Sequence, residues 1–297
     1  MQLPGDDPDL SAHPKLTLRR DPYTYSVETR NGQTIYSVSD GTRTISIPVR
    51  WSMGSGAQTW LLEYDGQFYE SLVSYYPSIE ALDLTIGDDR LTPSTLEAAI
   101  GRPLVTDGVT TCFGCHSTNA VLNRQLSLKT VVPGVTCEHC HTGAEAHSQA
   151  MMEGDMSVYP PALGQLSTER LSDFCGQCHR TWELVTRAGW RGPSNVRFQP
   201  YRLALSKCFD GADPRISCIA CHNPHQQVIR NTAFYDSKCL ACHSAAASAK
   251  PPHAKICPTA KSNCVSCHMP RVPLSGGHFV FTDHDIRVVK PNEPYPY

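Results

Sequence analysis

A five-residue pattern, Cys-x-x-Cys-His, occurs six times in this chain of 297 residues. The six copies use twelve of the 14 cysteines and six of the 13 histidines. They begin at unequal intervals of 25, 38, 43, 21 and 25 residues, which argues against a solenoid of equal repeats. The cysteines of the pattern are Cys112, Cys115, Cys137, Cys140, Cys175, Cys178, Cys218, Cys221, Cys239, Cys242, Cys264 and Cys267. The histidines that close it are His116, His141, His179, His222, His243 and His268.

The residue types in this pattern fit covalent haem attachment. Two cysteines three positions apart present their sulfurs to the two vinyl groups of one porphyrin, and the next residue lies under the iron. Four-cysteine zinc sites and a disulfide framework are alternatives, but neither needs a histidine after every cysteine pair. We therefore expect six covalently attached haem c groups, each with the histidine of its motif as the proximal iron ligand.

Seven histidines remain for the opposite faces of the six irons. A residue that closely follows a proximal histidine cannot reach around its own porphyrin, so His147 and His225 would ligate neighbouring haems. His139 lies inside a motif and is interpreted as a surface or propionate contact, and Met269 is the weaker distal option. The distal candidates are His13, His147, His225, His253, His278 and His284. Six candidates for six irons favour bis-His coordination of every haem.

Cysteines and arginines outside the motifs add two further expectations. In an oxidising compartment Cys208 and Cys257 would form a disulfide, with two free buried thiols as the alternative. Arginine pairs bidentately with carboxylates, so arginines between the motifs are candidate partners of haem propionates. These arginines are Arg187, Arg191, Arg197, Arg202 and Arg215.

The chain ahead of the motifs has the pattern of β-strands. Tyr23, Tyr25 and Val27 alternate with polar residues, and Pro48 makes its strand an edge strand at best. Further strand-like runs are Thr44–Val49, Thr59–Tyr64 and Phe68–Tyr76. The hairpin turns expected between the runs are Asn31-Gly32, Asp40-Gly41 and Asp65-Gly66.

Helices are expected in three places. A short capped helix precedes Gly101, a second covers Ser167–Phe174 and runs into Cys175, and residues 179–186 continue as helix. We therefore expect an α+β fold with little regular secondary structure. Residues 1–20 form an N-terminal segment that supplies His13, residues 21–90 a β-rich module without haem, and residues 91–297 a hexahaem domain. Its loops and helices wrap around closely packed haems.

Composition excludes several classes of protein. With 12 Tyr, 8 Phe and 4 Trp and a net charge of -2, disorder is not expected. No strongly basic patch supports nucleic-acid binding. No apolar run approaches the roughly 18 residues of a membrane span, so we expect no transmembrane segment. Residues 1–20 contain no signal peptide; because thioether attachment normally follows export, we expect a removed presequence and a periplasmic or extracellular location.

Several strings resemble multihaem c-type cytochromes related to the tetrahaem electron acceptor of hydroxylamine oxidoreductase and its multihaem relatives. The strings are Ser11-Ala-His13, residues 134–143 (GVTCEHCHTG), residues 218–225 (CIACHNPH), residues 264–270 (CVSCHMP) and residues 277–284 (GHFVFTDH). Residues 51–85 look like an accompanying non-haem module. The resemblance implies that His13 serves a distant haem and that His278 and His284 are ligands. Many relatives carry a further motif ahead of Ser-x-His, which this sequence lacks.

The sequence favours electron transfer. Irons closed on both faces cannot bind substrate but can pass single electrons, so we expect redox proteins as donor and acceptor and no catalytic residue. A reductase of nitrite, hydroxylamine or a sulfur oxyanion is one alternative. It needs an open-faced haem beside proton donors such as His139, Tyr159 or Arg180. A second alternative is a subunit of an extracellular filament, in which His13 or His284 ligates a haem of another copy.

Overall fold

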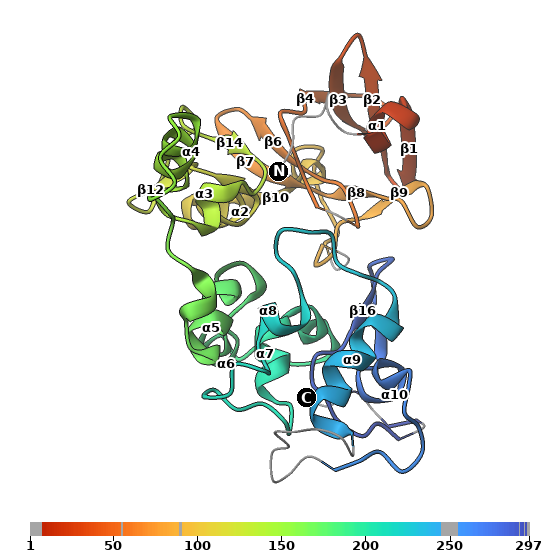
Figure 1. Cartoon of the computed structure of the whole chain (residues 1–297). Helices are drawn as coiled ribbons and strands as arrows, with labels where there is room; N and C mark the ends of the chain where they lie inside the picture. The colour runs from red at the N-terminus through yellow and green to blue at the C-terminus, as the bar shows by residue number, and fades with distance from the viewer. Residues whose placement is uncertain are drawn as a thin grey trace. The chain divides into compact units, whose positions relative to one another are not determined.

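The computed structural model describes residues 8–54, 56–88, 91–244 and 255–290, together with residues 292, 293 and 295. These residues form helices and antiparallel sheets connected by many loops, which confirms the α+β class. The chain divides into two compact units (Figure 1). The first comprises Met1–Pro161 and Ser275–Phe279, and the second comprises Ala162–Leu274 and Val280–Tyr297. The first unit thus takes in two motifs as well as the β-rich segment, and the second holds the other four.

The first unit starts with helix α1 (Pro8–Ala12) and a four-stranded antiparallel meander. Its strands are β1 (Lys15–Arg20), β2 (Tyr23–Arg30), β3 (Gln33–Ser39) and β4 (Thr44–Pro48). Tyr25 and Val27 point to the same buried face, as the alternation predicts. Asn31 and Gly32 join β2 to β3 with positive φ values of 51° and 74°, which a type I′ turn requires. The edge position of β4, predicted from Pro48, is confirmed.

A second four-stranded sheet has the order β10-β7-β6-β5, and β8 pairs with β9 beside it. The strands are β5 (Trp51–Met53), β6 (Thr59–Tyr64), β7 (Gln67–Ser71), β8 (Val73–Tyr76), β9 (Ala81–Leu84) and β10 (Gly101–Leu104). The run predicted over Phe68–Tyr76 is therefore two strands. The chain changes sheets at Leu72, whose N–H donates to the carbonyl of Ile100 (3.2 Å) and whose carbonyl accepts from Thr85 (2.9 Å).

The helix expected before Gly101 is only the 3₁₀ turn η2 (Ala98–Ile100). Gly101 has a φ of 151°, and a Cβ there would lie 2.0 Å from the carbonyl oxygen of Glu70. The close pairing of β10 with β7 thus requires glycine. This sharp change of direction ends the helical turn and starts the strand.

Two apolar clusters hold the first unit together. In the larger one the ring of Tyr36 lies 6.1 Å from that of Trp60, and its hydroxyl donates to the carbonyl of Ile100 (3.1 Å). In the smaller one Trp51 of β5 meets Phe113 edge to face, with ring centres 5.4 Å apart. Phe113 is fully buried and belongs to the first Cys-x-x-Cys-His motif. The β-rich module and the first motif therefore share a core.

Short elements make up the rest of the first unit. They are α2 (Thr106–His116), β11 (Ser117–Thr118), β12 (Val121–Leu122), β13 (Gln125–Leu126), β14 (Val132–Pro133), α3 (Cys137–Cys140) and α4 (Ala144–Met152). Strand β11 pairs with β14 and β12 with β13. These two small hairpin pairings connect the first motif to the second.

The second unit is mainly helices and loops. Its elements are η3 (Leu163–Gln165), α5 (Thr168–His179), α6 (Trp182–Arg187), η4 (Pro193–Arg197), α7 (Gln199–Ala204), α8 (Cys218–Cys221), α9 (Thr232–His243), α10 (Cys264–His268), β15 (Arg271–Pro273) and β16 (Val280–Thr282). Ser167 caps α5 by accepting the N–H of Arg170 (3.3 Å), in line with the predicted start. The helix expected to continue over residues 179–186 is interrupted, because Arg180 has a φ of 69° and α6 begins after Thr181. None of the helices in the described part of the chain is long and apolar enough to cross a membrane.

The shared core predicts that truncating Phe113 destabilises the whole first unit. Phe113→Ala should lower its free energy of unfolding by about 3–5 kcal/mol, since a fully buried aromatic ring is removed. Val105→Ala is the control: Val105 is 76% exposed, and its loss should change stability by less than about 0.5 kcal/mol. Hydrogen exchange of the main-chain amides in β5, β6 and β7 measures the change in stability for both variants. Equal effects of the two substitutions would contradict a shared core.

Candidate functional site

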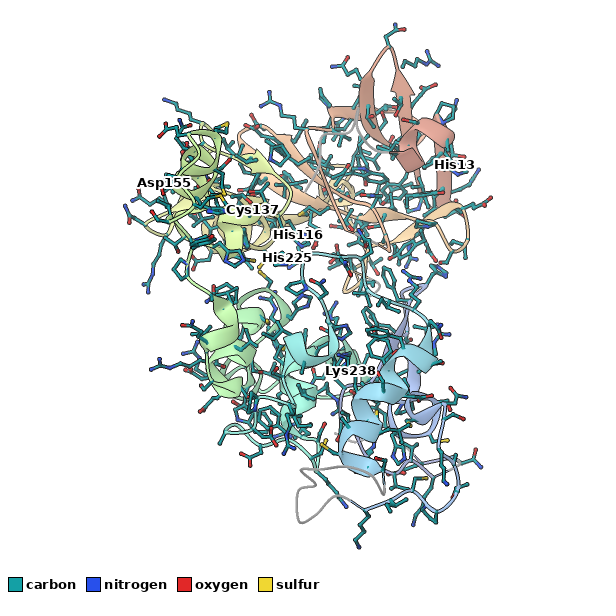
Figure 2. The ribbon with its side chains drawn as sticks, viewed as in Figure 1. His13, His116, Cys137, Asp155, His225 and Lys238 are labelled. Atoms are coloured by element: carbon teal, nitrogen blue, oxygen red, sulfur yellow. The ribbon has the colours of Figure 1, made fainter. Side chains whose placement is uncertain are left out.

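All six Cys-x-x-Cys-His motifs lie on a turn of α-helix. Three of them end the longer helices α2, α5 and α9, and three are single turns, α3, α8 and α10. Residues three apart on a helix project from the same face, so each cysteine pair presents both sulfurs to one side. The histidine is the last helical residue or the one that follows it. This arrangement suits two thioether bonds and an axial imidazole (Figure 2 labels His116 and Cys137).

Four of the six motif histidines are bound through Nδ1. In three of them Nδ1 donates to a main-chain carbonyl: His141 to Pro161 (3.3 Å), His243 to Lys255 (2.7 Å) and His268 to Arg287 (2.9 Å). The Nδ1 of His222 lies 3.4 Å from the hydroxyl of Tyr235, which itself donates to Ile229. Bonds of this kind fix the ring and its tautomer and leave Nε2 for a metal.

One buried threonine connects the first two motifs. The hydroxyl of Thr118, just after the first motif, donates to the carbonyl of Gly134 (3.0 Å). It accepts the main-chain N–H of Thr136 (3.0 Å), the residue before the second motif. Asn119 donates to Glu138 inside that motif (3.2 Å). The two motifs are therefore fixed relative to each other.

The third and fourth motifs meet through their cysteines. Cys175 on α5 and Cys218 on α8 are close neighbours, and each is the largest cause of the shift in the other's pKa, which is lowered for Cys175 and raised for Cys218. Thr168 at the start of α5 also donates to the carbonyl of Asp213 (2.8 Å), ahead of α8. The third and fourth motifs thus lie side by side.

The fifth and sixth motifs are joined by Asp236 on α9. Its carboxylate accepts the N–H of Asn263 (2.7 Å) and of Cys264 (2.8 Å) at the start of α10. These two N–H groups, that of Cys264 first, hold the pKa of Asp236 below its ordinary value. Cys239 of the fifth motif and Cys264 of the sixth are also close neighbours, and burial raises the pKa of both thiols.

The ring of His284 lies near the ring of His222, the histidine of the fourth motif. The ring centres of His284 and His222 are 6.2 Å apart, and the planes are inclined by 42°. Two imidazoles on one iron have centres roughly 6 Å apart, because each metal–nitrogen bond is about 2 Å long. The Nδ1 of His284 donates to the carbonyl of Thr282 (3.0 Å), so its Nε2 is left for a metal. Burial lowers the pKa of His284 to about 4 and that of His222 also, so both rings are in the neutral, ligating form.

The other distal candidates differ from one another. His147 donates through Nδ1 to the carbonyl of Val158 (2.5 Å), the pattern of the proximal histidines. His278 instead uses Nε2, which lies 2.8 Å from the carboxylate of Asp83. The ring of His13 packs 5.3 Å from that of the buried Tyr75, and His225 is exposed. His253 lies outside the described residues.

The segment around His284 contains an ionic cluster that the sequence did not predict. Arg202 on α7 binds both carboxylate oxygens of Asp283 (2.8 Å each) and also Asp285 (3.2 Å). Arg202 is one of the candidate partners of a haem propionate, and in this structure its guanidinium binds these two aspartates. The partners are 81 and 83 residues away along the chain. Only the alternation Asp-His-Asp-Ile-Arg at residues 283–287 hinted at them.

Two more of the candidate arginines bind protein carboxylates instead of standing free for propionates. Arg187 lies 3.6 Å from Glu183, one turn before it on α6, and Arg215 binds Asp213 (2.6 Å). A local acidic partner at a spacing of two or four residues explains both pairs. The nearby acidic residues Glu183 and Asp213 are visible in the sequence, but they were not considered as partners of these arginines.

The two cysteines outside the motifs are not joined to each other in this structure, and a disulfide between Cys208 and Cys257 stays a prediction. Burial raises the pKa of Cys208, which lies near Cys221 and Cys242, whereas N–H groups of the following loop lower the pKa of Cys257. The two sulfurs thus sit in different surroundings. In the part of the chain that the structure describes, no three His, Cys, Asp or Glu side chains converge as the ligands of a bare metal ion would.

Comparison with known proteins gives one distant similarity. The chain is 23% identical over 224 residues to "Multiheme cytochrome MtrA" of Shewanella baltica (strain OS185). The match covers 69% of this chain and 58% of that protein, which is less than two thirds of its length. No family model matches the chain, and no solved structure matches it.

The capping role of Asp236 predicts a pH-dependent effect of Asp236→Asn. At neutral pH the thermal midpoint of the second unit should fall by roughly 2–4 °C. Because the pKa of Asp236 is lowered in the folded state, its stabilisation is present above the unfolded-state pKa of about 4. It is lost as the pH falls through the folded-state pKa, so the difference from the unsubstituted protein should shrink on acidification.

Scanning calorimetry across the acid range measures this difference. Asp173→Asn, at an exposed position on α5, is the matched control and should leave the midpoint unchanged. A midpoint difference for Asp236→Asn that stays constant on acidification would contradict the capping role.

Proposed function

We propose that the chain is a multihaem c-type cytochrome that carries out electron transfer through six haems. The single observation that carries this proposal is the pair His222–His284, whose spacing fits two axial ligands of one iron. Six helical Cys-x-x-Cys-His turns support the count of six attachment sites. The distant similarity to a multihaem cytochrome supports the same class.

Cysteines and histidines of this chain have different roles in holding the haems. The twelve motif cysteines form the thioether bonds, and the six motif histidines supply one axial nitrogen each. His284 supplies the second axial nitrogen opposite His222, and His147 is the next best supported distal ligand because its Nδ1 is also bound to a carbonyl. For His13, His225, His253 and His278 a distal role remains part of the proposal on the count of ligands alone.

Haem with two axial imidazoles exchanges single electrons and has no open face for substrate. The chain sets the basicity of the proximal imidazoles through the acceptors of Nδ1, which are carbonyls in three motifs and Tyr235 in the fourth. Cys175 lies beside Cys218 and Cys239 beside Cys264, so the attachment points of successive haems are close together. Short separations favour transfer along the chain.

The proposed location follows from thioether chemistry, and the proposed role as a carrier follows from the pairing of His284 with His222. The protein acts in the periplasm or outside the cell, between redox proteins that donate and accept electrons. A relation to the tetrahaem acceptor of hydroxylamine oxidation is proposed on the strings around the motifs. His284 pairs with a histidine of its own chain, which favours a carrier over a filament that shares this ligand between copies.

Closed haems predict a simple spectroscopic result. Electron paramagnetic resonance of the oxidised protein should show low-spin ferric signals alone, and the reduced protein should bind no carbon monoxide, because every iron already has two protein ligands. Intact-mass measurement gives the haem count, which should be six. A high-spin signal that changes on addition of nitrite or hydroxylamine would support the reductase instead.

The axial pair predicts the effect of His284→Ala. The reduced variant should bind one carbon monoxide per chain while keeping all covalent haems, since attachment depends on the motif cysteines. His139→Ala is the matched control, because His139 lies inside a motif and is not expected to ligate iron. Optical titration with carbon monoxide measures both. A six-haem His284→Ala protein that binds none would overturn the assignment.

A further inference from the structure

One short segment at the end of the second unit serves two motifs. Residues 283–287 carry His284, which faces His222 of the fourth motif. The carbonyl of Arg287 accepts the bond from Nδ1 of His268 in the sixth motif (2.9 Å). The N–H of Arg287 also donates to the carbonyl of His268 (3.2 Å). The position of this segment therefore affects the ligands of two haems at once.

Arg202 fixes that segment from α7. Its Nε and Nη2 each donate to one carboxylate oxygen of Asp283 at 2.8 Å, and Nη2 also donates to Asp285 at 3.2 Å. These two aspartates flank His284 directly. Arg202 is 1% exposed and Asp283 is 0% exposed, so the pair is out of water. The ring of Tyr295 covers the guanidinium at 4.6 Å.

Ser206, just beyond α7, holds the main chain of the same segment. Its hydroxyl donates to the carbonyl of His284 (2.9 Å) and accepts the N–H of Ile286 (2.7 Å). Arg287 adds a second guanidinium on Asp283 (2.7 Å). The main chain at His284 and at Ile286 is thus bound, in addition to the carboxylates of the two residues that flank His284.

The bonds of Arg202 and Ser206 restrict the position of residues 283–287 more tightly than apolar packing alone would. A buried guanidinium–carboxylate pair is seldom a net gain in stability over apolar residues of similar size. Its planar, bidentate geometry does restrict where the two partners can lie. Here it restricts the two residues on either side of an imidazole that has to meet an iron within a few tenths of an ångström.

We propose that Arg202 is a positioning residue that holds His284 on the iron of the fourth haem; this rests on the proposed function. Arg202 acts through Asp283 and Asp285, the two residues that flank His284. Ser206 assists by holding the main chain of His284. Without Arg202, the segment loses its link to α7 and His284 leaves the iron.

Carbon monoxide titration of the reduced full-length holoprotein tests this role, with His284→Ala as the reference. Arg202→Met should keep all six haems and bind close to one carbon monoxide per chain, as His284→Ala does. Arg202→Lys should bind an intermediate amount, because an ammonium cannot span both carboxylates. Arg187→Met is the control, since Arg187 lies on the surface of α6, and it should bind none.

The outcomes separate a positioning role from a general structural one. An Arg202→Met protein that is less heat-stable but binds no carbon monoxide would overturn the proposal, because Arg202 would then only stabilise the fold. If Arg202→Met yields no folded holoprotein, Ser206→Ala takes its place as the test. Carbon monoxide binding by Ser206→Ala above that of the unsubstituted protein supports the proposal. A Ser206→Ala protein that binds no carbon monoxide contradicts the proposal. If His284→Ala binds no carbon monoxide, the axial pair of the proposed function fails instead.

Discussion

A single turn of α-helix sets the geometry on which this protein depends. It places two cysteine sulfurs on one face and ends at a histidine, and the chain repeats this arrangement six times. The histidine side chains are then oriented by acceptors for Nδ1, mostly main-chain carbonyls supplied by segments that follow the motif. Loops without regular structure are thus essential parts of the sites, because they provide the groups that hold each imidazole.

Consecutive motifs are held together by very few side chains. Thr118 joins the first motif to the second, and Asp236 joins the fifth to the sixth. Between them, Cys175 and Cys218 lie side by side. Such local bonds can fix the spacing of the motifs, whereas among the described residues the two apolar clusters both lie in the first unit. The extended β-sheets of the first unit, by contrast, bury their own aromatic core around Trp60.

Local features were predictable from the sequence, and long-range ones were not. The turn at Asn31-Gly32, the edge strand at Pro48 and the cap at Ser167 each follow from residue types close together in the chain. The break at Leu72 depends on partners in other strands, and the ionic cluster of Arg202 joins residues some eighty positions apart. Likewise, the pairing of His284 with His222 needed the fold, because spacing alone assigns no distal ligand to a particular motif.

Near-infrared magnetic circular dichroism of the oxidised holoprotein tests the central claim most directly, because its charge-transfer band distinguishes bis-imidazole haem from methionine-ligated and high-spin haem. The account predicts a band of the bis-imidazole type alone, with an intensity corresponding to six haems per chain. A methionine-ligated or high-spin component, or a polypeptide with no haem band, would contradict it.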